Sequence, residues 1–129
     1  MGGVAAVRDN RRAVTTTVLI VDDHPSFRAS ARRLLEADGY AVVGEAVDGA
    51  SAIDAAGRLA PDLVLLDVHL PDADGFAVAA ALTAARDAPA VVITSSHSGS
   101  DYGALVEGSG ARGFVAKAEL SGAALEALL

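Results

Sequence analysis

Hydrophobic and polar positions alternate in blocks along this chain. Short, continuous apolar runs are each followed by a longer stretch in which apolar residues recur every three or four positions. The short runs are typical of strands buried on both faces, and the longer stretches are typical of helices with one apolar face. The alternation therefore predicts an α/β fold in which helices cover both faces of a parallel sheet.

Five β/α units fit the length between Thr17 and the C-terminus. The expected strands are Thr17 to Val21, Ala41 to Val47, Asp62 to Asp67, Ala90 to Thr94 and Ala111 to Ala116. The expected helices begin at Pro25 and Ser121 and, between these, cover residues 50–59, 75–86 and 101–108. Glycines crowd the last of these ranges, and each interior glycine costs a helix about 1 kcal/mol relative to alanine, so a weak and mobile helix is expected there.

Successive β/α units connect through right-handed crossovers, which gives a doubly wound, flavodoxin-like sheet. The strand order 2-1-3-4-5 is expected, with its topological switch between the first and third strands. Ligands of open α/β sheets bind at such a switch, outside the carboxyl ends of the strands. The residues that follow these two strands are therefore the first candidates for a functional site.

Three carboxylates stand at that place. Asp22 and Asp23 follow the first apolar run, and Asp67 closes the third. So much negative charge in one cleft is costly without a cation, and an all-oxygen set of ligands favours a hard ion such as Mg²⁺. A magnesium site that serves phosphoryl chemistry is the expected function of this edge of the sheet.

Composition narrows the classes of protein to which the chain could belong. The chain has 129 residues, the size of one domain, and a formal net charge of −7, which argues against a general nucleic-acid-binding surface. It has no cysteine, and no apolar stretch approaches the roughly 20 residues of a membrane-spanning helix. A cytoplasmic protein without direct contact to membranes or DNA is expected. Residues 1–16 follow neither periodicity and are interpreted as a tail, which leaves residues 17–129 as the domain.

Four motifs, in order, resemble the receiver domain of two-component response regulators. They are VLIVDDHP (residues 18–25), LLDVHLPDADGF (65–76), VVITS (91–95) and GFVAK (113–117). The resemblance covers about Thr17 to Leu129 and is closest to receivers of regulators that carry a LuxR-type DNA-binding module. It leaves open whether the chain acts alone or is the front half of a larger regulator.

The resemblance implies a role for each motif residue. Asp67 would be the phosphoacceptor for a phosphohistidine on a sensor histidine kinase. Mg²⁺ would be bound directly by Asp23 and Asp67, through water by Asp22, and by the backbone carbonyl of His69. The side chains of Lys117 and Thr94 would contact the phosphoryl oxygens. No enzymatic activity is implied beyond magnesium-dependent self-phosphorylation and autodephosphorylation.

The family also implies a switch and an output surface. The hydroxyl of Thr94 would shift on phosphorylation, and the aromatic side chain of Phe114 would turn inward. A homodimer or an effector protein would bind the face formed by the fourth helix, fifth strand and fifth helix. His69, two residues beyond the phosphoacceptor, is expected to tune the lifetime of the phosphoryl group.

Other functions stay open at this point. An atypical receiver could act by binding alone. Asp72 and Asp74 superficially resemble the Asp-x-Asp motif of haloacid-dehalogenase-type phosphatases, although they come too late after the strand. A flavodoxin-type carrier could use the serines that follow Thr94 to bind a flavin phosphate. A transition-metal site could draw on the histidines near strand ends, which are His24, His69 and His97.

Overall fold

The computed structural model describes residues 15–96 and 102–129. Its strands are β1 (Thr17–Val21), β2 (Ala41–Ala46), β3 (Leu63–Asp67), β4 (Ala90–Ser95) and β5 (Gly113–Ala116). Its helices are α2 (Pro25–Ala37), α3 (Gly49–Leu59), α4 (Gly75–Thr83), α5 (Gly103–Gly108) and α6 (Gly122–Glu126), with a 3₁₀ turn, η2 (Lys117–Glu119), between β5 and α6.

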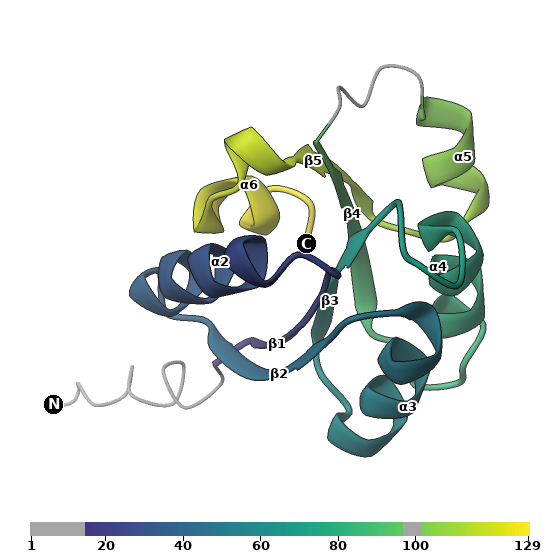
Figure 1. Cartoon of the computed structure of the whole chain (residues 1–129), viewed down its shortest axis with the longest axis horizontal. Coiled ribbons are helices and arrows are strands. Elements are labelled where there is room, and N and C mark those ends of the chain that lie inside the picture. The colour runs from purple at the N-terminus through teal and green to yellow at the C-terminus, as the bar shows by residue number, and fades with distance from the viewer. Residues whose placement is uncertain (1–14, 97–101) are drawn as a thin grey trace, which may run out of the picture.

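The five strands form one parallel sheet in the order β2-β1-β3-β4-β5. Helices α2 and α6 cover one face of the sheet, and α3, α4 and α5 cover the other (Figure 1). The doubly wound, flavodoxin-like architecture and the strand order predicted from the sequence are confirmed. The first and third strands are neighbours, as the topological switch requires.

Two apolar clusters, one on each face, hold the layers together. Every residue of β3 is buried, and its side chains alternate between the clusters. Val64 and Leu66 pack beneath α3 and α4, whereas Leu63 and Leu65 pack beneath α2 and α6. This two-sided burial explains why the strand is a continuous apolar run rather than an alternating one.

Several predicted boundaries were wrong by a few residues. Strand β2 ends before Val47, which is exposed, and β5 begins at Gly113 rather than Ala111. Helix α4 ends at Thr83, three residues before the predicted Arg86, where the Thr83 hydroxyl donates a hydrogen bond to the carbonyl of Ser109. A tertiary contact of this kind leaves no signal in helical periodicity.

Two further predictions fall partly outside the residues that the structure describes. Helix α5 begins at Gly103, and Asp101, where the predicted helix begins, lies outside them. The mobility expected of that helix stays a prediction. Most of the predicted N-terminal tail, residues 1–14, is also outside. Within the described ranges, no helix is long and apolar enough to cross a membrane.

Candidate phosphoryl-transfer site

Strands β1 and β3 bring the three predicted carboxylates to one edge of the sheet. Val21 lies opposite Leu66 in the parallel register, so Asp22 and Asp67, the next residues along, emerge side by side. Ligand atoms of Asp22, Asp23, His24 and Asp67 all lie within 4.8 Å of one another. Asp22 and Asp67 are buried, whereas the side chain of Asp23 is 37% exposed. The cluster therefore has a buried floor and an open side.

Lys117 is the cation of this cluster. Its ammonium Nζ lies 2.6 Å from Asp22 Oδ2 and 3.5 Å from Asp67 Oδ2, and its side chain is only 13% exposed. The shorter contact is an ion pair without hydrogen-bond geometry, since Asp22 Oδ2 has no hydrogen-bond partner among the described residues. Nζ also lies 4.6 Å from the centre of the Phe27 ring, a cation–π contact that holds the lysine stem in place.

Charge and burial set the protonation of Asp67. Burial raises the pKa of the Asp67 carboxyl above its ordinary value, and the negative charge of Asp22 raises it further. The Lys117 ammonium opposes this shift, as does the backbone N–H of His69, which donates to Asp67 Oδ1 at 3.5 Å. The site is therefore short of positive charge in the absence of a bound cation.

Thr94 lies beside Asp67 in the sheet. It is the β4 residue paired with Asp67 in the parallel register, and its side chain is fully buried. Among the described residues, its Oγ1 has no hydrogen-bond partner. A buried hydroxyl without a partner costs free energy, so a ligand that accepts its hydrogen bond would be stabilised here.

The donor set fits a divalent cation. Carboxylate oxygens of Asp22, Asp23 and Asp67 converge on one place, and one of them, Asp22 Oδ2, lacks a hydrogen bond. Hard cations take such oxygens as ligands, and the excess negative charge would stabilise them. Asp23 and Asp67 both belong to this cluster, and the direct contacts to a cation that the sequence predicts for them stay a prediction. The side chain of His69, by contrast, is exposed, and the expected use of its backbone carbonyl stays a prediction.

Backbone hydrogen bonds hold the loop after β3 in place. The N–H of Val68 donates to the carbonyl of Thr94 at 3.0 Å, and the N–H of Gly75 donates to the carbonyl of Val68 at 2.7 Å. His69 and Asp74 form an isolated antiparallel bridge across the loop. The segment that carries Asp67 is thereby held to both β4 and the start of α4.

Phe114 lies away from the carboxylates, in an aromatic row. It is partly buried and packs against the apolar cluster beneath α3, α4 and α5. Its ring centre lies 5.7 Å from that of Tyr102, which in turn lies 5.6 Å from that of Phe76. Since Phe76 belongs to α4 and Tyr102 immediately precedes α5, the row joins β5 to both helices.

Asp72 and Asp74 are helix caps in this structure. Asp72 caps α3 by accepting hydrogen bonds from the N–H groups of Gly49 and Ala50. These two hydrogen bonds lower the pKa of the Asp72 carboxyl. Asp74 accepts from two N–H groups in the first turn of α4. Both carboxylates are therefore engaged by backbone groups, which removes the support for a phosphatase-type Asp-x-Asp motif.

Sequence reasoning missed two contacts of the β1–α2 loop. His24 Nδ1 lies 2.9 Å from Asp22 Oδ1 and 3.2 Å from Asp23 Oδ1, so this histidine belongs to the carboxylate cluster. Arg28, which the pattern places only on the polar side of its helix, donates to the backbone carbonyl of Asp22 at 2.7 Å. The only available signal was proximity in sequence to the acidic pair. His97, the third member of the predicted histidine set, lies outside the described residues, as do Ser98 and Ser100.

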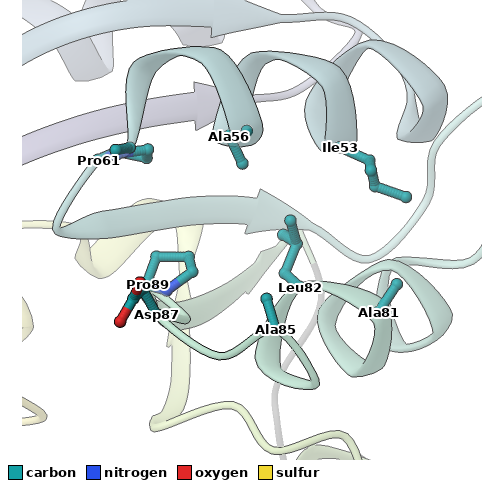
Figure 2. Close-up of a pocket in the computed structure, with 10 residues that line it drawn as sticks. Ile53, Ala56, Pro61, Ala81, Leu82, Ala85, Asp87 and Pro89 are labelled. Carbon is teal, nitrogen blue, oxygen red and sulfur yellow. The ribbon is translucent and has the colours of Figure 1, made fainter.

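A separate groove of about 450 Å³ lies between α3 and α4. Figure 2 shows Ile53 and Ala56 of α3 facing Ala81 and Leu82 of α4 across it. Pro61 and Pro89, which precede β3 and β4, line its other end, which therefore lies by the amino ends of these strands (Figure 2). The carboxylates lie at the carboxyl ends, and the groove is therefore distinct from the candidate site.

Known proteins match this chain along most of its length. The response regulator receiver domain family matches residues 18–128. The nitrate/nitrite response regulator protein NarP of Escherichia coli is 46% identical over 104 residues, which are 78% of this chain and 47% of NarP. A protein-glutamate methylesterase/protein-glutamine glutaminase of Anaeromyxobacter dehalogenans is 42% identical over 118 residues, which are 91% of this chain and 33% of that protein.

A solved structure of a response regulator also resembles this chain. The two-component response regulator of the LuxR family from Aurantimonas sp. is 34% identical and superposes with a TM-score of 0.79, covering 88% of this chain and 85% of the other. The chain spans about half the length of NarP and a third of the methylesterase, and the names of these two relatives state different activities. With its four motifs, its sheet order and these matches, the chain belongs to the response regulator receiver domains of two-component systems.

Proposed function

We propose that this receiver domain accepts a phosphoryl group on Asp67 from a phosphohistidine of a sensor histidine kinase. The observation that carries the proposal is the convergence of a buried carboxylate, a partly buried ammonium and an unpartnered buried hydroxyl at one edge of the sheet. A carboxylate oxygen is a competent nucleophile toward phosphorus. As the P–O bond to Asp67 forms, the P–N bond breaks and the histidine leaves with the electron pair.

Lys117 and Thr94 would stabilise the charge on the transferred group. The transition state of phosphoryl transfer spreads negative charge over three equatorial oxygens. The Lys117 ammonium lies 3.5 Å from Asp67 Oδ2, and the Thr94 hydroxyl is free to donate to an oxygen bound there. When bound by Asp23 and Asp67 directly, by Asp22 through water and by the His69 carbonyl, Mg²⁺ would neutralise further charge on these oxygens.

The Thr94 hydroxyl would also couple phosphorylation to the surface that binds a partner. A hydrogen bond from Thr94 to the phosphoryl group would draw the β4 end toward Asp67. The aromatic row of Phe76, Tyr102 and Phe114 joins β5, the strand beside β4, to α4 and α5. We infer that phosphorylation changes the face formed by α5, β5 and α6, through which a second copy or an effector protein binds. Neither direct binding to nucleic acid nor a separate enzymatic activity is part of this proposal, and the cytoplasmic location stays a prediction.

Incubation with acetyl phosphate and Mg²⁺ tests the proposal. Intact mass spectrometry is expected to show one added phosphoryl group, and EDTA is expected to prevent the addition. Addition that is independent of metal would contradict the magnesium site. No addition under any condition would favour the alternative of an atypical receiver that acts by binding alone.

His69→Ala is expected to change the rate of dephosphorylation while phosphorylation still occurs. The side chain of His69 is exposed two residues beyond Asp67, where it can control the water that attacks the acyl phosphate. The decay of phosphorylated protein, followed by intact mass after removal of acetyl phosphate, measures the effect. A decay rate equal to that of the unaltered chain would contradict this role for His69.

A further inference from the structure

Arg28 links the carboxylate loop to the edge strand of the sheet. From the first turns of α2, its Nη1 donates to the backbone carbonyl of Asp22 at 2.7 Å, and its Nε donates to Glu45 Oε1 of β2 at 2.9 Å. The side chain of Arg28 is only 16% exposed. A guanidinium is the one cationic side chain whose fixed fork serves two acceptors in this way.

The hydrogen bond from Arg28 means that both backbone groups of Asp22 are hydrogen-bonded. Its N–H donates to the carbonyl of Ala46 at 3.0 Å, and its C=O accepts from Arg28, which is anchored on Glu45. Both backbone groups of Asp22 are therefore tied to consecutive residues at the end of β2. The same C=O belongs to the peptide plane between Asp22 and Asp23, so the direction in which Asp23 leaves the strand depends on this bond.

We propose that Arg28 is a positioning residue, which orients the Asp22–Asp23 peptide so that both carboxylates face a divalent cation. The inference rests on the proposed function, because it presupposes the cation site. Arg28 touches neither a carboxylate oxygen of the site nor the reacting atoms; it acts through the backbone. Groups that orient metal ligands in this way typically change metal affinity about 10- to 100-fold when they are removed.

Positioning by Arg28 would strengthen the binding of a divalent cation, whereas the positive charge of Arg28 would weaken it. A guanidinium near the site repels a divalent cation, so loss of its charge alone would strengthen cation binding. Glu45 neutralises much of this charge, and Arg32 shares the same carboxylate, with Nε 2.8 Å from Glu45 Oε2. The direction of the change in Mg²⁺ affinity therefore separates positioning from charge.

Arg32 provides the matched control. It carries the same charge on the same helix, and its hydrogen bonds among the described residues go to Glu45 and Glu36 rather than to the carboxylate loop. Arg28→Lys is the informative partner variant. It keeps the charge and loses the fork, so a single ammonium cannot hold both Glu45 and the Asp22 carbonyl in the observed geometry.

Titration of the unphosphorylated full chain with Mg²⁺, followed by amide NMR shifts, tests the proposal. Arg28→Ala and Arg28→Lys are expected to weaken binding about tenfold, whereas Arg32→Ala is expected to bind as the unaltered chain does. Tighter binding by Arg28→Ala, or unchanged binding by Arg28→Lys, would overturn the inference alone. Absence of Mg²⁺ binding by the unaltered chain would overturn the proposed function together with it.

A second measurement needs no cation. The N–H of His24 donates to Asp22 Oδ1 at 2.8 Å, so its hydrogen exchange reports on the order of the loop. Faster exchange of this amide is expected in both Arg28 variants and not in Arg32→Ala, at a temperature where all of them are folded. Exchange that is unchanged in the Arg28 variants would show that the loop keeps its geometry without the guanidinium and would overturn the proposal.

Discussion

Asp67→Asn is expected to abolish magnesium-dependent labelling by acetyl phosphate and, at neutral pH, to raise the melting temperature. The first effect follows because an amide is not a nucleophile toward phosphorus under these conditions. The second follows from the electrostatics of the site. Asp67 is buried next to Asp22, and both features raise the pKa of the Asp67 carboxyl above its ordinary value of 3.8. Its ionised form therefore destabilises the folded chain.

The pH dependence of this gain has a definite sign. A carboxyl with a raised pKa in the folded state binds its proton more tightly there than in the unfolded chain. Its cost to stability is absent below the pKa of the unfolded chain, grows as the pH rises, and is complete above the folded pKa. The gain from Asp67→Asn should accordingly be largest at neutral pH and fade as the pH falls toward about 4.

Thermal unfolding of the metal-free protein at several pH values measures this effect. Asp54→Asn is the matched control, since Asp54 is exposed and its ion pair among the described residues is with Arg58 on the same helix face. Exposed pairs of this kind contribute little, so the control should melt near the unaltered chain at each pH. A lower melting temperature for Asp67→Asn at neutral pH, or labelling that survives the change, would contradict the account of the site.

Gly75→Ala is expected to destabilise the protein by about 3 kcal/mol and to slow phosphorylation. A Cβ atom at Gly75 would lie 2.8 Å from the Cα of Val68 and 3.0 Å from the carbonyl carbon of Asp67. These are backbone atoms that cannot rotate away, so either α4 or the end of β3 must move. The backbone of Gly75 is not in the left-handed region, and the cost is therefore one of space rather than of conformation.

Gly57→Ala supplies the control for this prediction. Gly57 lies within α3, and a Cβ there would meet nothing within 4 Å. The same substitution should stabilise the protein by about 0.5 to 1 kcal/mol, because alanine favours the helix. Urea unfolding measures both changes, and acetyl phosphate labelling shows whether Asp67 has been displaced. A Gly75→Ala protein as stable and as readily labelled as the unaltered chain would contradict the close approach of α4 to the backbone of Asp67.

Much of the fold could be predicted because its strands are buried on both faces. The runs that became β1 and β3 are short and apolar, and a carboxylate marks the carboxyl edge at each: Asp22 follows β1, and Asp67 ends β3. The strand order then places Asp22, Asp23 and Asp67 together without further information. Lys117 and Thr94 join them because β5 and β4 end at the same edge.

The remaining features depend on directions that a sequence does not encode locally. The apolar pattern of α2 explains that Phe27 is partly buried, but not that its ring lies beneath Lys117. Arg28 and Arg32 both lie on the polar side of α2, and only tertiary structure distinguishes the one that reaches the Asp22 carbonyl. Likewise, the sequence likens Asp72 to part of a phosphatase-type motif and does not show its role as a helix cap, because its partners, Gly49 and Ala50, lie far away along the chain.

Locating the phosphoryl group within the chain tests most directly whether Asp67 accepts it. Borohydride reduction of the protein treated with acetyl phosphate and Mg²⁺ converts an acyl phosphate on aspartate to homoserine, which peptide mass spectrometry can place. We expect homoserine at position 67 and unmodified aspartate at positions 22 and 23. Homoserine at either of those two positions, or a phosphoryl group that resists reduction because it lies on another kind of side chain, would contradict the claim that Asp67 is the phosphoacceptor.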